Sequence, residues 1–222
     1  MLVAVIADIH ANAAALEALA ADLARADRVI CLGDMTGYYC EVNETLDALR
    51  RLDALCVLGN HDAMVLAGGA PSTAGESVRF GVEFAARVIT PAHRAWLQSL
   101  PTVWGGIIDG HSWLAAHGSP WRPLDDYLYA DSPLLADIGR FDCDLLLAGQ
   151  THRPLHLEGR PALLNPGSVG QSRHRPAVAC AALVDTASLA AELVERPYNP
   201  APVIALAREN GAGSWIEHHL AG

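Results

Sequence analysis

The chain has 222 residues, of which 51% are hydrophobic and 18% charged, and this composition predicts a single compact domain over residues 1–222 rather than a disordered chain. Its net charge of −10 argues against extended binding to nucleic acids, which depends on cationic side chains that neutralise phosphates. The five scattered cysteines form no C-x-x-C pair and no apolar run approaches about 18 residues, so we expect a cytoplasmic protein without a disulfide framework or a membrane span.

The N-terminal part of the chain alternates between short apolar strands and amphipathic helices. The sequence predicts strands at 2–7, 27–34 and 54–60, and helices at 12–24 and 42–52, in which leucines recur at helical spacing. Strands that alternate with helices in this way form parallel sheets. Because ligands bind at the carboxyl ends of the strands in such sheets, the residues that follow each strand are candidates for a functional site.

The pattern changes in the middle of the chain. Residues 63–100 predict helices and loops, with one helix that starts at Thr90 and ends at Pro101. A hairpin over 102–118 turns at Asp109–Gly110. The remaining predicted strands lie at 144–149, 177–185 and 190–198, with a hairpin at 155–165. A final helix is predicted with Asn199 as its cap and Pro200 as its first residue, and it ends at Gly211.

Polar side chains follow five of the predicted strands. They are Asp8 and His10, Asp34, Asn60 and His61, His117, and Gln150 and His152. Each alone has an ordinary structural alternative, such as a helix cap for Asp8, a turn for Asp34 or a core position for His152. Together they form a set of carboxylate, carbonyl and imidazole donors without cysteine, which suits Mn²⁺, Fe or Zn²⁺.

The order of these residues resembles that of a known family. D-x-H at 8–10, G-D at 33–34, G-N-H-D at 59–62, H-G at 117–118 and G-x-x-H at 149–152 resemble the motifs of the calcineurin-like metallophosphoesterases. The stretch ALLNPGSVGQSR is similar to the small bacterial branch described as diadenosine tetraphosphatase-related phosphoesterases. The resemblance implies a four-layer α/β/β/α sandwich, in which two mixed sheets pack face to face with helices on the outer faces. It also implies metal-dependent hydrolysis of a phosphomonoester or phosphodiester in a small phosphorylated substrate.

The resemblance also implies a role for each motif residue. The first of two divalent metal ions would be held by Asp8, His10, Asp34 and His152, and the second by Asp34, Asn60, His117 and the residue at the position of Gln150. Two such ions, about 3.5–4 Å apart, share a bridging hydroxide that attacks phosphorus. His61 would protonate the leaving oxygen as general acid, and its alternative role is a hydrogen bond that supports the ligands.

One motif position departs from the family pattern. Gln150 stands where family members usually have histidine, and an amide oxygen is a poorer ligand than imidazole for these metals, so we expect a weaker second metal site. The alternative is a non-catalytic metal-binding scaffold protein with a degenerate site, although the retained His61 favours an enzyme. The segment GDMTGYY has Gly37 and Tyr38 where the protein phosphatases of the family have Asp and Arg, which argues against phosphoprotein substrates.

Two further residues are candidates for substrate binding. Asn12 would contact phosphate or cap the helix that follows the first strand, and the cap is the favoured alternative. Arg173 lies in a predicted loop, and its forked N–H donors suit a phosphate. A position on the solvated surface without a binding role is an equal alternative for this residue. No chemistry is assigned to His93, His156, His174, His218 and His219.

Overall fold

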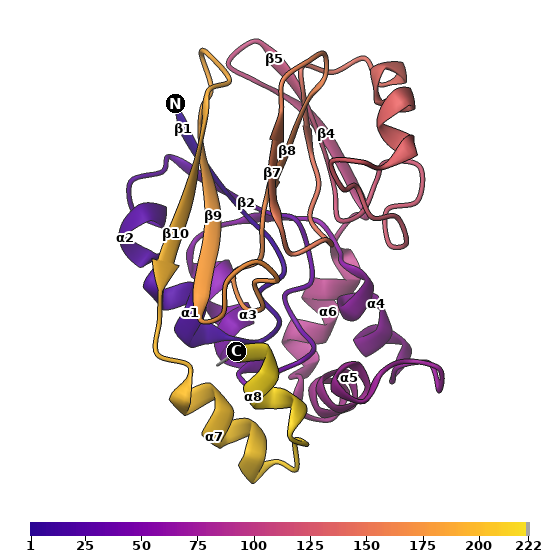
Figure 1. Ribbon diagram of the computed structural model, residues 1–222, viewed down its shortest axis with the longest axis vertical. Helices are drawn as coiled ribbons and strands as arrows, with labels where there is room; N and C mark the ends of the chain where they lie inside the picture. Colours follow the sequence, from indigo (N-terminus) through magenta and orange to yellow (C-terminus); the bar gives the residue numbers. More distant parts are fainter. Residues whose placement is uncertain (221–222) are drawn as a thin grey trace.

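The computed structural model describes residues 1–220, and two five-stranded mixed sheets that pack face to face form its centre (Figure 1). The first sheet has the order β10-β9-β1-β2-β3, in which β1, β2 and β3 are parallel and β9 is antiparallel to both of its neighbours. Its strands are β1 (Leu2–Ile6), β2 (Arg28–Cys31), β3 (Leu55–Cys56), β9 (Val178–Asp185) and β10 (Ala191–Pro197).

The second sheet has the order β4-β5-β6-β8-β7, with a parallel centre and antiparallel strands at both edges. Its strands are β4 (Val103–Ile108), β5 (His111–Ala116), β6 (Leu145–Leu147), β7 (Pro154–Leu157) and β8 (Ala162–Pro166). The parallel strands of both sheets end on the side of the molecule where the connecting loops carry the polar residues singled out above.

Alternation of side chains along the strands separates the apolar interior into layers. In β1, Val3 and Val5 pack between the sheets, whereas Ile6 packs under the helices. In β6, Leu147 packs between the sheets and Leu146 faces the opposite side. Because both faces of each sheet are covered, the central strands are almost continuous apolar runs.

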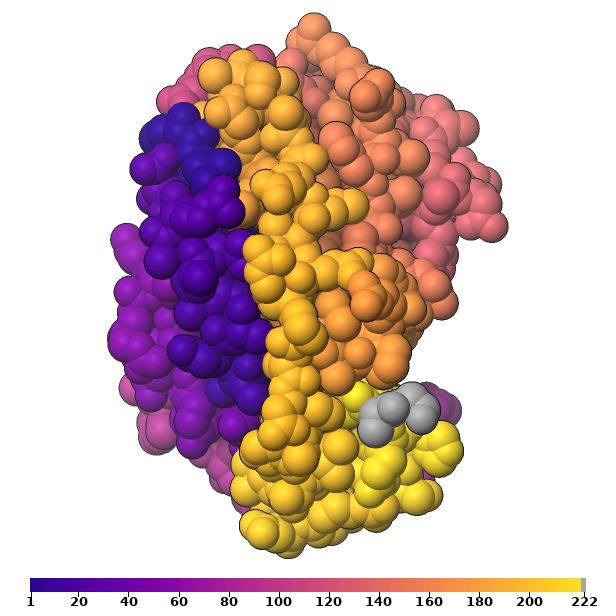
Figure 2. Space-filling view, turned by 60° about the vertical axis from the view of Figure 1, so that its left-hand side comes forward, coloured from indigo at the N-terminus to yellow at the C-terminus, as the bar shows by residue number. Residues whose placement is uncertain are grey.

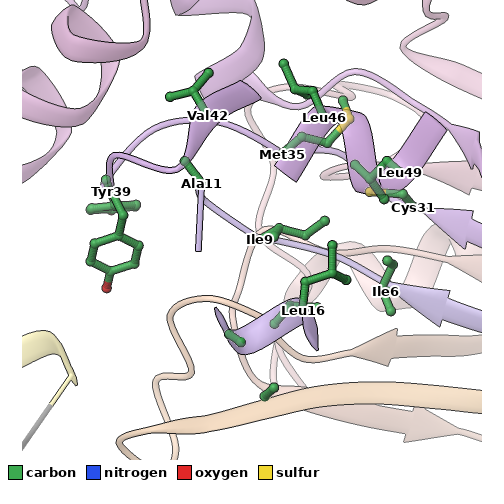
Figure 3. Packing of buried hydrophobic residues seen from close by; sticks show 14 of the residues in the cluster. Ile6, Ile9, Ala11, Leu16, Cys31, Met35, Tyr39, Val42, Leu46 and Leu49 are labelled. Atoms are coloured by element: carbon green, nitrogen blue, oxygen red, sulfur yellow. The ribbon is translucent and has the colours of Figure 1, made fainter. Parts of the chain in front are cut away.

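Helices pack on the outer face of the first sheet and, in the lower part of Figure 1, beyond the ends of its strands. They are α1 (Ala13–Ala18), α2 (Ala20–Leu23), α3 (Val42–Arg51), α4 (Asn60–Ala67), α5 (Glu76–Val88), α6 (Pro91–Ser99), α7 (Ala201–Glu209) and α8 (Trp215–Leu220). Leu16 of α1 and Leu46 of α3 belong to the same apolar cluster as Ile6 of β1 and Ile9 (Figure 3). Val203 and Ile216 bring the two C-terminal helices into this cluster.

The outer face of the second sheet is covered by a 3-10 helix, η1 (Pro133–Arg140), and not by α-helices. Leu134, Leu135 and Ile138 pack there against Leu146 and Leu163. The expected four-layer sandwich is therefore confirmed, with a thin fourth layer that the sequence pattern does not predict.

The helix predictions differ from the structure in three places. α7 begins at Ala201, one residue later than expected, with Pro200 as its N-cap, although the Asn199 side chain accepts a hydrogen bond from the Ala201 N–H at 3.1 Å. The helix expected over 12–24 is divided at Leu19 into α1 and α2. Gly211, with a left-handed φ of 93°, follows the end of α7 as expected, but the chain then forms α8, whose six residues are too few for a periodic pattern. Among residues 1–220, no helix has the length and apolar character needed to cross a membrane.

A glycine allows α5 to lie against the loop that follows β2. A Cβ added at Gly81 would lie 2.0 Å from the backbone nitrogen of Tyr38, a residue with a left-handed φ of 53°. A side chain at this position would displace the loop that carries Tyr38 toward the polar strand ends.

We predict that Gly81→Ala lowers the free energy of unfolding by about 1–3 kcal/mol, the usual cost of overpacking, although alanine is favoured over glycine in a helix by about 1 kcal/mol. The control is Gly69→Ala, where an added Cβ would meet nothing within 4 Å and the expected change is below about 0.5 kcal/mol. Urea denaturation measures both changes. If Gly81→Ala lowered the free energy of unfolding no more than Gly69→Ala, the loop would accommodate the added side chain without loss of stability.

Candidate metal centre

The polar residues that follow the strands meet in one place. Asp8 and His10 follow β1, Asp34 follows β2, Asn60 and His61 begin α4 after β3, His117 follows β5, and Gln150 and His152 follow β6. All of them except Asn60 are at most 5% exposed. Side chains from five strands of two sheets therefore share one buried site.

A first group of ligand atoms comes from the loops after β1 and β6. His152 Nε2 lies 3.1 Å from His10 Nε2 and 3.4 Å from Asp8 Oδ1. One ligand atom from each of these three residues lies within 4.8 Å of the others. These are three of the four residues that the family resemblance assigns to the first ion.

A second group surrounds Asp34, the fourth residue of the first set. His117 Nε2 lies 3.4 Å from Asp34 Oδ2 and 3.0 Å from Asn60 Oδ1. Asp34 Oδ2 is also 3.7 Å from His10 Nε2, so this carboxylate stands between the two groups. That position is the one a bridging ligand requires.

The histidine rings are oriented by backbone carbonyl oxygens. Each ring donates its Nδ1–H: His10 to Thr36 at 3.1 Å, His117 to Leu32 at 2.8 Å and His152 to Gln171 at 2.7 Å. A carbonyl oxygen can only accept a hydrogen bond, so Nδ1 must carry the proton. In a neutral ring Nε2 then presents a lone pair to the site, which is the tautomer a metal ligand needs.

These residues fit a bound metal ion. Asp8 Oδ1 is buried and has no hydrogen-bond partner among residues 1–220. The Nε2 atoms of His10 and His152 face each other at 3.1 Å, where two lone pairs repel. A divalent cation bound by these atoms removes both penalties, and carboxylate and imidazole are suitable donors for it.

The protonation states of the cluster agree with this fit. Burial lowers the pKa of His10 far below its ordinary value and that of His152 to about 3, so both rings are neutral. Burial disfavours the charged forms of Asp34 and His117, yet His117 holds the pKa of Asp34 below its ordinary range and Asp34 raises the pKa of His117 to about 10. Burial raises the pKa of Asp8 to about 7 against the opposing charge of His117. A bound cation would replace the proton on His117.

His61 lies beside Asp34 at the start of α4. Its backbone N–H donates to Asp34 Oδ1 at 2.9 Å, and its Nε2 lies 3.9 Å from Asp34 Oδ2. Its Nδ1 is buried without a hydrogen-bond partner in residues 1–220, next to Gly37, where an added Cβ would approach it to 2.3 Å. The ring stacks on Tyr38 with 4.8 Å between centroids. Burial lowers the pKa of His61, and the Asp34 carboxylate opposes this shift. Packing therefore holds the ring with Nε2 toward the carboxylates.

Asp62 positions the backbone around the ligands. Its carboxylate accepts hydrogen bonds from the backbone N–H groups of Gly59, Met35 and Thr36 at 3.0–3.3 Å, and from the Thr36 hydroxyl at 2.8 Å. It thereby joins the start of α4 to the loop that carries Asp34. Its carboxylate forms no hydrogen bond with the His61 ring, so orienting the turn is the role that the hydrogen bonds support.

The loop over 165–170 braces two ligand-bearing loops, a role that sequence reasoning missed. Asn165 Nδ2 donates to the Gly149 carbonyl oxygen and the Ser168 hydroxyl to the Asp8 carbonyl oxygen, both at 2.7 Å. At Gly170, an added Cβ would lie 1.8 Å from the Ile9 carbonyl oxygen, so this close approach requires glycine. The NPGSVG segment carried the family resemblance and was the signal that could have indicated this role.

Gln150 presents its amide to the site without a competing partner. Its backbone N–H donates to Asp8 Oδ2 at 3.1 Å, but its side chain makes no hydrogen bond with any residue in 1–220. It lines a cavity of about 150 Å³ together with Asp34, Asn60 and His61. Gln150 therefore borders the cavity beside the candidate ligands Asp34 and Asn60.

The two candidate substrate-binding residues have different positions. Asn12 is 0% exposed; its Oδ1 accepts from the Ala15 N–H at 3.0 Å and its Nδ2 donates to the Gly170 carbonyl and the Tyr198 hydroxyl, both at 3.0 Å. These bonds support the helix cap and leave no amide group for phosphate. Arg173, in contrast, lines the same cavity as Gln150.

Comparisons with known proteins agree with this geometry. A model of the calcineurin-like phosphoesterase superfamily domain matches residues 1–188. An uncharacterized protein of Methanocaldococcus jannaschii is 29% identical over 238 residues, which cover 99% of this chain and 97% of that protein. The crystal structure of a metallophosphoesterase from Sphaerobacter thermophilus is 29% identical, with a TM-score of 0.86 and coverage of 100% and 98%. A hypothetical protein from Pyrococcus horikoshii, 20% identical, shares the fold with a TM-score of 0.83 and coverage of 100% and 98%.

We predict that Gln150→His strengthens the weaker of two metal sites by about tenfold or more, because imidazole binds Mn²⁺, Fe or Zn²⁺ more firmly than a neutral amide. Titration of metal-free protein with Mn²⁺ in a calorimeter measures both affinities. The wild type should show one tight site and one weak site. Two equally tight sites in the wild type, unchanged by the substitution, would show that Gln150 is already an adequate ligand or that another group replaces it.

Proposed function

The chain belongs to the calcineurin-like phosphoesterase superfamily, and from that premise we propose that it is a metal-dependent hydrolase of phosphomonoesters or phosphodiesters. One observation carries the proposal: the Nε2 atoms of His10, His117 and His152 converge on two buried carboxylates while their Nδ1 atoms are held by carbonyl oxygens. This arrangement suits bound cations and serves no purpose in a core that packs apolar side chains.

The distances support the assignment of ligands that the family resemblance implies. One ion would be held by Asp8, His10, Asp34 and His152, and the second by Asp34, Asn60, His117 and Gln150. When bound, two divalent cations supply a hydroxide nucleophile at neutral pH and neutralise the charge of the phosphate oxygens. The residues of the chain then have to orient the ester and provide a proton for its leaving oxygen.

We infer that His61 provides that proton, and its position supports this role. It lines the same cavity as Asp34 and Arg173, and its Nε2 is on the side of the carboxylates. A proton held at Nε2 would pass to the leaving oxygen as the ester bond breaks, which is general acid catalysis. Arg173 would orient the phosphate through its forked N–H donors.

A metal-binding scaffold without catalytic activity is the alternative, and Gln150 is the observation that favours it. A weak second site lowers the occupancy of the second ion, which the proposed chemistry needs. Asp34, Asn60, His61 and His152 line one cavity. Asp8 and His10 lie within 3.4 Å of His152, and His117 lies 3.4 Å from Asp34. For this reason we propose the enzyme.

The proposed function is tested by metal removal. Chelated protein should lose hydrolysis of p-nitrophenyl phosphate and bis(p-nitrophenyl) phosphate and regain it with Mn²⁺, because the ligands act through the metal. Asp34→Asn should be the most damaging ligand change, since its carboxylate stands between both ligand groups. Full activity after rigorous metal removal would contradict the mechanism, and a metal-loaded wild type that cleaves neither ester would favour the scaffold.

A second prediction concerns His61. We expect His61→Gln to depress kcat far more for esters with alkoxide-like leaving groups than for p-nitrophenyl esters, because p-nitrophenolate leaves readily without a proton. Turnover of paired alkyl and p-nitrophenyl esters at saturating Mn²⁺ measures the difference. An equal loss on both kinds of ester would argue against the general acid role.

A further inference from the structure

A second and larger cavity adjoins the candidate metal centre. Its volume is about 500 Å³, compared with about 150 Å³ for the cavity beside Gln150. Tyr38 and Arg173 line both cavities, so the two cavities adjoin at these side chains. We call the larger one the arginine cavity, after Arg153, Arg173 and Arg175 in its lining.

The charge of the arginine cavity is opposite to that of the protein. The chain has a net charge of −10, yet the cavity is lined by three arginines and three histidines, and no aspartate or glutamate is among its lining residues. Arg175 and His174 form ion pairs with Glu195 at 2.6 Å and 2.7 Å. Arg153 and Arg173 have no carboxylate partner within residues 1–220. Two guanidinium groups that form no ion pair in this described part of the chain thus border a space next to the candidate metal centre.

The far wall of the cavity is the C-terminal helix. His218 and His219 of α8 line it, and His219 contacts Tyr38 edge to face with 5.8 Å between ring centroids. Gln171 Nε2 lies 3.0 Å from His219 Nδ1. In Figure 2 the yellow atoms of the C-terminal helices lie next to an orange segment whose colour corresponds to residues near 170. α8 therefore forms one wall of the cavity, beside the loop that orients His152.

A ligand for this cavity must be anionic and larger than a single phosphate. Orthophosphate occupies a small part of such a volume, and the metal centre already provides for the phosphate that is attacked. A guanidinium group can donate two parallel hydrogen bonds to two oxygens of one phosphate, and it stays protonated at any physiological pH. Two independent anions on either side of Arg173 would repel each other, whereas two phosphates of one molecule share a single cost of association.

We propose that the arginine cavity binds a second phosphate group of the substrate, and that the substrate class is a phosphate ester or anhydride with at least two phosphates. This inference rests on the proposed function. It assigns Arg153 a role in binding the phosphate that is not cleaved, and it leaves the cleaved phosphate at the metal centre.

The test uses pairs of chromogenic diesters. The p-nitrophenyl phosphodiesters of ethanediol, propanediol and butanediol are prepared with the far hydroxyl either free or phosphorylated, so that the leaving group is constant and the span between phosphates varies. At saturating Mn²⁺, the wild type should prefer the phosphorylated member of at least one pair by about tenfold or more in kcat/KM, the effect expected of charge-assisted hydrogen bonds.

Two variants and a control locate the effect. Arg153→Gln should remove most of this preference through KM, and Arg153→Lys should keep part of it because the charge remains without the fork. Arg50→Gln, on the exposed side of α3, removes the same charge outside the arginine cavity and should leave the preference unchanged. Arg153 is exposed, so its replacement leaves the core intact.

The outcomes separate this inference from the proposed function. If the metal-loaded wild type cleaves none of the diesters or simple monoesters, the proposed function fails. If it cleaves both members of every pair equally, or if Arg153→Gln lowers kcat on both alike, the function stands and the inference is wrong. Activation of the unphosphorylated diesters by added orthophosphate would also overturn it, because the cavity would then hold a separate effector.

Discussion

The site is organised by one electrostatic constraint, which is that carboxylates and imidazole lone pairs share a volume nearly closed to water. Asp8 and Asp34 are 0% and 2% exposed, and buried carboxylates are costly unless a cation or hydrogen-bond donors compensate them. His10 and His152 cannot donate from Nε2, because their single protons lie on Nδ1. The surrounding loops therefore hold these groups together against repulsion, and a cation is the compensation that their donor atoms suit.

Holding the ligands requires backbone conformations that most residues avoid. Five of them have left-handed φ values: Asp8 55°, His10 54°, Asp34 52°, Gln150 68° and His152 58°. Each such position costs on the order of 1 kcal/mol or more and persists only where the surroundings fix it. Here Asp62, Asn165 and Ser168 fix it through hydrogen bonds to the backbone of the same loops. The strain of the ligand-bearing loops is therefore supported by hydrogen bonds at the site itself.

The ligands could be predicted from the sequence because each follows a strand, and parallel strands bring their ends to one edge. Their orientation could not, because the groups that fix it are the backbone carbonyls of Leu32, Thr36 and Gln171, which have no signature in side-chain identity. The sequence left two roles open for Asn12, and only its buried hydrogen bonds distinguish them. The arginine cavity was also beyond prediction, since it depends on where the short helix α8 packs.

The two cavities differ in the origin of their positive charge, and this difference divides their roles. Under the proposed function, the charge at the candidate metal centre would come with bound cations and would vary with the occupancy of the site beside Gln150. In the arginine cavity it is fixed, because guanidinium groups do not lose their protons. An acidic protein repels polyanions at long range. Clustered arginines nevertheless attract an anion that comes within about 10 Å, because salt screening at moderate ionic strength is incomplete over that distance. Under the proposed function, selection among phosphorylated molecules would therefore arise in the arginine cavity, and the metal centre would contribute reactivity with little selectivity of its own.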